Sequence, residues 1–108
     1  MNYEKKICLN ISLYQDYHRL EDLNEFITAL ADANPDFARV INIGQSYEGR
    51  EMLVLAVEKA GPGAPSIWLE AGIHAREWIS PAVAAFIVRE LVICTPLFQR
   101  LGKTYSVQ

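Results

Sequence analysis

The segment Met52–Val57 (MLVLAV) constrains the fold most, because it is apolar at every position. Successive side chains of a β-strand point to opposite faces, so a strand of this composition presents apolar groups on both faces. Such a strand suits the interior of a sheet that is covered on both sides. The sequence therefore predicts an α/β fold in which 52–57 is an interior strand.

A helix and a second strand are predicted just before this segment. Apolar residues recur at helical spacing over Leu20–Ala33, and Asn34-Pro35 ends the helix because proline disfavours helix in the residue before it. Ala38–Ile43 alternates and is β-branched, and the glycine-bracketed loop Gly44–Arg50 follows it. This spacing predicts a β-hairpin that includes the interior strand.

A third strand and a second helix are predicted after it. The strand covers Ser66–Ala71, and the helix runs from Pro81 to about Ile93, with Ser80 as the capping residue and proline in the first turn. The tail after Phe98 predicts no element. Because this second helix is apolar nearly all round, we expect it to be buried within a larger body than three strands and two helices provide.

Charge and hydropathy exclude two classes of protein. The net charge is -3, and the longest basic run is Lys5-Lys6, so a nucleic-acid groove is not expected. The longest apolar stretch, Pro81–Val88, is far shorter than the roughly 20 residues of a membrane-spanning helix. We therefore expect neither nucleic acid nor a membrane span.

The two cysteines, Cys8 and Cys94, are too few for a disulfide scaffold or a thiolate zinc site. One bridge between them is possible, but buried free thiols are the expectation. Lys5-Lys6 precedes the short apolar stretch Ile7–Leu13, which has no clear small-residue cleavage site. We expect no signal peptide in this chain.

The candidate chemistry lies in Gly72–Trp78, where His74 and Glu77 form an H-x-x-E pair after a predicted strand. Imidazole nitrogen and carboxylate oxygen are zinc ligands, and a catalytic zinc uses three protein ligands plus one open position. The alternative is a histidine bonded to backbone beside a solvated Glu77. Arg76 suits an anionic substrate or a surface salt bridge equally well. His18 is interpreted as a surface histidine at the start of the first helix.

Three segments resemble one known family. Gly72–Ala82 (GIHAREWISPA) is similar to the first zinc-binding segment of the zinc metallocarboxypeptidases of the pancreatic carboxypeptidase A/B type. Ile43–Arg50 resembles a glycine-rich loop of the same family, and Tyr17–Leu23 resembles the start of its catalytic domain. Their order and spacing fit, so the resemblance covers about Tyr14 to Leu101.

The resemblance implies a fold, a function and site residues. The fold would be the N-terminal portion of a mixed-sheet zinc carboxypeptidase domain. His74 and Glu77 would be two of three ligands to Zn²⁺, and Arg76 would line the substrate groove. The enzyme would be a secreted hydrolase that removes C-terminal residues from peptides. Residues 14–108 would form a partial, truncated catalytic domain, with residues 1–13 unassigned.

The sequence also departs from the pattern of the family. In the family a histidine well downstream completes the zinc site and a later glutamate is the base, but no histidine follows His74 in these 108 residues. We therefore expect an incomplete site that is inactive alone. The alternatives are a non-catalytic truncated product acting as a binding module, and a chain that is not a stable domain by itself.

Overall fold

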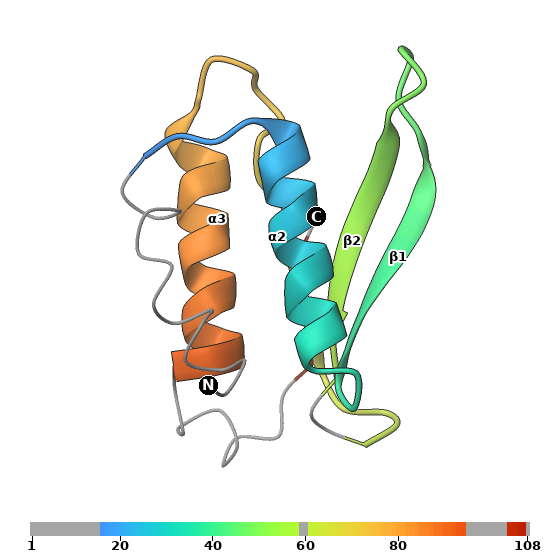
Figure 1. Ribbon diagram of the computed structural model, residues 1–108. Helices are drawn as coiled ribbons and strands as arrows, with labels where there is room; N and C mark the ends of the chain where they lie inside the picture. The colour runs from blue at the N-terminus through green and yellow to red at the C-terminus, as the bar shows by residue number, and fades with distance from the viewer. Residues whose placement is uncertain (1–15, 59–60, 95–103, 108) are drawn as a thin grey trace.

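A computed structural model of the chain describes residues 16–58, 61–94 and 104–107. Figure 1 shows two helices side by side, with a β-hairpin next to the first of them. The elements in chain order are α2 (Leu20–Ala33), β1 (Ala38–Gln45), β2 (Glu51–Val57), β3 (Ser66–Leu69), α3 (Ile79–Arg89), the π-helical turn η2 (Glu90–Cys94) and β4 (Thr104–Val107). The predicted α/β class is confirmed.

The described part of the chain contains a four-stranded sheet with the order β1-β2-β4-β3. Strands β1 and β2 form the predicted antiparallel hairpin, with Val40 opposite Leu55. Strand β4 is antiparallel to β2 and parallel to β3, so β2 has a neighbour on each side. The prediction that 52–57 is an interior strand is confirmed.

The core joins the sheet to both helices. Its fully buried large side chains are Leu30 of α2, Leu55 of β2 and Val88 of α3. Leu55 and Val57 belong to this cluster, while Val54 and Ala56, which alternate with them along β2, are also buried, with 3% and 4% exposure. Both faces of β2 are therefore covered, as its composition requires.

Helix α3 begins earlier than the sequence predicts. It starts at Ile79, and the capping position is Trp78 rather than Ser80. The amide of Ser80 donates to the carbonyl of Glu77 at 3.0 Å, while its hydroxyl accepts from the amide of Gly72 at 3.1 Å. The predicted cap was wrong because the Ser80 side chain bonds back to the preceding loop instead of capping its own helix.

Strand boundaries also differ from the prediction. Strand β3 ends at Leu69, two residues before the predicted end, and β1 continues to Gln45. The extension of β1 includes an irregular register between Asn42 and Gln45, where Gly44 adopts φ 133 and its amide donates to Asn42 Oδ1 at 2.9 Å. A glycine at such a φ lets the strand continue through the irregularity.

Strand β4 was missed by the sequence analysis, which predicted no element after Phe98. Its residues Thr104–Val107 pair with both β2 and β3, which precede it by many residues in the chain. Threonine, tyrosine and valine favour strands, so a local signal existed, but four residues are too few for a periodic pattern. Distant pairing therefore decided this element.

Several predictions have only partial outcomes. Helix α3 buries Ala84, Ala85 and Val88, but Val83 stays 46% exposed, so further cover for this helix remains a prediction. No helix within the described ranges is long and apolar enough to cross a membrane. The predictions for Cys8, for the apolar stretch at 7–13 and for the side chain of Cys94 lie outside the described residues.

Replacing Leu30 with alanine should destabilise the fold strongly. The side chain has 0% exposure, and deleting buried methyl groups from such a site costs about 2–5 kcal/mol. The matched control is Leu20→Ala in the same helix, where the side chain is 46% exposed and the cost should stay below about 1 kcal/mol. Urea unfolding of the two variants measures both values, and equal losses would contradict the assigned core.

Candidate metal centre

The candidate site is built on the loop between β3 and α3, which begins at Gly72. This position follows the carboxyl end of a strand, where open α/β sheets place ligands. Gly72 adopts φ 80, and a Cβ there would lie 3.2 Å from Pro81 Cγ. Its amide donates to Ser80 Oγ at 3.1 Å, which closes the loop onto the first turn of α3. The loop conformation thus depends on glycine at this position.

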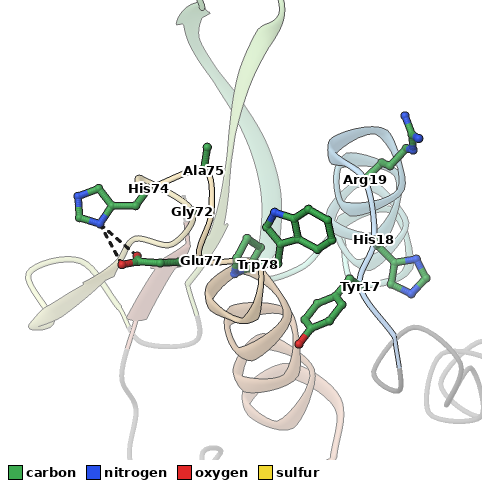
Figure 2. A pocket seen from close by; sticks show the side chains of 9 residues that line it. Tyr17, His18, Arg19, Gly72, His74, Ala75, Glu77 and Trp78 are labelled. Carbon is green, nitrogen blue, oxygen red and sulfur yellow. Dashed lines mark hydrogen bonds and ion pairs between the residues drawn. The ribbon is translucent and has the colours of Figure 1, made fainter.

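A backbone turn brings His74 and Glu77 together. The amide of Glu77 donates to the carbonyl of His74 at 3.1 Å. His74 Nδ1 lies 3.1 Å from Glu77 Oε2 and 3.2 Å from Oε1, as the dashed lines in Figure 2 show. The carboxylate therefore faces the imidazole, which disagrees with the alternative of a merely solvated Glu77.

The geometry of this pair fits a shared zinc ion. Two ligand atoms that each lie about 2.0–2.2 Å from one zinc are at most about 4.4 Å apart. The observed separations of 3.1 and 3.2 Å satisfy this limit. The two side chains are 70% and 54% exposed, so an ion can reach them. Among the described residues, however, no group of three or more His, Cys, Asp or Glu side chains could hold a metal.

A cavity of about 430 Å³ lies beside the pair. It is bounded by residues 17–19 just before α2, the loop between β3 and α3, and the first turn of α3. Its lining residues are Tyr17, His18, Arg19, Gly72, His74, Ala75, Glu77, Trp78 and Pro81. Figure 2 shows the His74–Glu77 pair on one side of this view and the residues that precede α2 on the other.

Of the other two residues named from the sequence, His18 lines this cavity together with the pair, whereas Arg76 does not. Arg76 is exposed, and it is not one of the described residues that line this cavity. Its role with substrate remains a prediction. His18 precedes α2, and its Nδ1 lies 3.7 Å from Asp22 Oδ2. It therefore lies at the helix start, as predicted. Its side chain is partly buried, so it is less exposed than a surface histidine.

An aromatic contact at this site was not found by the sequence analysis. The rings of Tyr17 and Trp78 meet edge to face, with centroids 6.0 Å apart and planes inclined by 73°. The two residues are far apart in the chain, so no spacing rule connects them. Trp78 directly follows Glu77, and this adjacency was the available signal that Trp78 belongs to the site.

The fold and the pair define a class: an α/β protein with a histidine and a glutamate, residue types that can bind zinc, close together on the loop that follows a strand. The zinc carboxypeptidase family model matches residues 23–105. Carboxypeptidase B of Astacus astacus is 42% identical over 79 residues, which are 73% of this chain and 26% of that protein. Carboxypeptidase A1 of Homo sapiens is 37% identical over 78 residues, which are 72% of this chain and 19% of that protein.

The solved structures agree with the sequence relatives. The crystal structure of thrombin activatable fibrinolysis inhibitor (TAFI) superposes with a TM-score of 0.78 and 31% identity, covering 88% of this chain and 25% of that one. The chain therefore belongs to the zinc carboxypeptidase family, as its motifs predict. It spans about a quarter or less of the length of the relatives it matches.

Replacing Gly72 with alanine should destabilise the loop between β3 and α3. Alanine at φ 80 is strained and its Cβ crowds Pro81, so we expect a cost of about 1–3 kcal/mol in the free energy of unfolding. Gly61→Ala is the matched control, because nothing lies within 4 Å of a Cβ there and no positive φ occurs. Urea unfolding measures both changes, and a neutral Gly72→Ala would contradict the loop conformation.

Proposed function

We propose that the protein acts as a zinc-dependent carboxypeptidase, a hydrolase that removes C-terminal residues from peptides. The observation that carries the proposal is the contact of His74 Nδ1 with both carboxylate oxygens of Glu77 on the loop after β3. The relatives named above are carboxypeptidases, which supports the same reaction class. Because the chain covers about a quarter or less of their length, the activity of the whole enzyme stays a proposal.

His74 and Glu77 would supply two of the three zinc ligands. A zinc ion bound there would polarise the scissile carbonyl and lower the pKa of a bound water. The chain's own contribution is to present a nitrogen and a carboxylate on one side of a turn, held by the Glu77 amide and the Gly72–Ser80 hydrogen bond. Their exposure leaves room for further ligands and for substrate.

Arg76 would bind the substrate. Arg76 would line the substrate groove, where its guanidinium can donate paired N–H groups to an anionic substrate. Its position between the two ligand residues and its exposure support this role. Secretion of the enzyme also belongs to this proposal, and it rests on the resemblance to the family alone.

A binding module is the second candidate function. Apolar side chains are exposed beside the loop and along α3, namely Ile73, Ile79 and Val83. Exposed apolar patches of this kind mark surfaces to which other proteins can bind. Size-exclusion chromatography separates the candidates, because a binding module should stay monodisperse with this surface exposed, whereas an incomplete catalytic domain should self-associate.

The 108-residue polypeptide should bind Zn²⁺ weakly, with a Kd above about 1 μM, because two ligands do not complete the coordination shell. Titration with zinc, followed by the ring NMR signals of the two histidines, measures the affinity at each. His74→Ala and Glu77→Ala should abolish the response, whereas His18→Ala should leave it unchanged. A response that survives in His74→Ala would contradict the assigned ligands.

The same polypeptide should not hydrolyse peptides. The resemblance implies a downstream histidine ligand and a downstream glutamate base, and residues 78–108 contain no histidine. Peptides ending in aromatic, aliphatic or basic residues should stay intact with added zinc, as followed by mass spectrometry. Release of the terminal residue that stops on adding a chelator would show that these 108 residues are sufficient.

A further inference from the structure

We propose that Tyr17 is a positioning residue for the loop 72–78, called the metal loop here because it carries His74 and Glu77, and that it acts through Trp78. The edge-to-face contact of these two rings links the residue next to Glu77 with the segment that precedes α2. The inference rests on the proposed role of His74 and Glu77 as zinc ligands. It concerns how this chain holds those ligands before any metal binds.

The ligand pair is not fixed by burial. The His74 and Glu77 side chains are 70% and 54% exposed, and Ile73 beside them is exposed as well. The loop is instead held by a few contacts at its ends. At the beginning, Gly72 donates to Ser80 Oγ at 3.1 Å. At the end, the Glu77 carbonyl accepts from the Ser80 amide at 3.0 Å, and Trp78 contacts Tyr17.

The aromatic contact restrains the residue that follows Glu77. The ring centroids are 6.0 Å apart and the planes are inclined by 73°, which is the edge-to-face geometry that aromatic pairs prefer. Figure 2 shows the Trp78 ring directed toward Tyr17, while His74 and Glu77 project to the other side of the loop. The contact therefore leaves the ligand atoms open to a metal while limiting movement of the backbone between Glu77 and Trp78.

Tyr17 lies three residues before the first residue of α2, Leu20. Two residues further on, the Arg19 amide donates to Asp22 Oδ2 at 3.3 Å, and the Arg19 carbonyl accepts from Leu23 at 3.1 Å. Helix α2 in turn is held in the core by its buried side chains, of which Leu30 is fully buried. The Tyr17–Trp78 contact thus joins the metal loop to the chain segment that leads into α2.

The first test needs no metal. Backbone ¹⁵N relaxation of the 108-residue chain gives order parameters for the amides of residues 73–77. In the unsubstituted chain and in Tyr17→Phe, which keeps the ring, we expect values near 0.85, and in Tyr17→Ala a fall toward 0.6. Tyr47→Ala is the control, because that tyrosine is fully exposed in the β1–β2 loop. Unchanged order parameters in Tyr17→Ala would overturn the proposal.

The second test measures zinc affinity at His74 by NMR titration. Loss of an aromatic pair changes an equilibrium by about two- to tenfold, so Tyr17→Ala should raise the Kd by that factor. Tyr17→Phe and Tyr47→Ala should keep the original Kd. Trp78→Ala should raise it by a similar factor, and the double variant Tyr17→Ala/Trp78→Ala should be no weaker than the weaker single variant.

The outcomes separate the two proposals. If zinc binds at His74 and the Kd is the same in Tyr17→Ala, the positioning role is wrong while the ligand assignment stands. If zinc gives no response at His74 in the unsubstituted chain, the ligand assignment fails, and the metal-free order parameters still decide the role of Tyr17. If Tyr17→Phe behaves like Tyr17→Ala, the ring contact is not the cause and the proposal is overturned.

Discussion

The burial of β2 on both faces is the constraint on which the rest of the structure depends. Leu55 and Val57 lie in one cluster with residues of α2 and α3, and Val54 and Ala56 are buried on the opposite face. Apolar area removed from water contributes about 25 cal/mol per Å² to the free energy of folding. This burial fixes the sheet against two helices, and the loop between β3 and α3 takes its place from these elements.

The loop between β3 and α3 combines a local turn with contacts to other elements. The turn that unites His74 and Glu77 needs only neighbouring residues, since its hydrogen bond joins the amide of one to the carbonyl of the other. Contacts to other elements flank that turn: Gly72 bonds to Ser80 in α3, and Trp78 contacts Tyr17 before α2. The His74–Glu77 pair is thus formed by a local turn, and residues on either side of that turn contact other elements.

Prediction from sequence succeeded where the governing interactions are short in range. The bounds of α2 are those that its apolar spacing and Asn34-Pro35 predict, because helix periodicity and a proline stop act within a few residues. Ser80 shows the opposite case. A serine before a proline often caps a helix, but the Ser80 hydroxyl accepts a hydrogen bond from the Gly72 amide across the loop. A rule based on local sequence does not include this competing partner.

The sequence by itself determined the α/β class, the interior position of β2 and the identity of the candidate ligands, because these follow from local periodicity, residue chemistry and a specific motif. The tertiary structure decided the insertion of β4 between β2 and β3, the start of α3 at Ile79 and the contact of Tyr17 with Trp78. Each of these features depends on residues that are distant in the chain or that compete for the same hydrogen-bonding group. Their selection depends on packing geometry rather than on the spacing of residues.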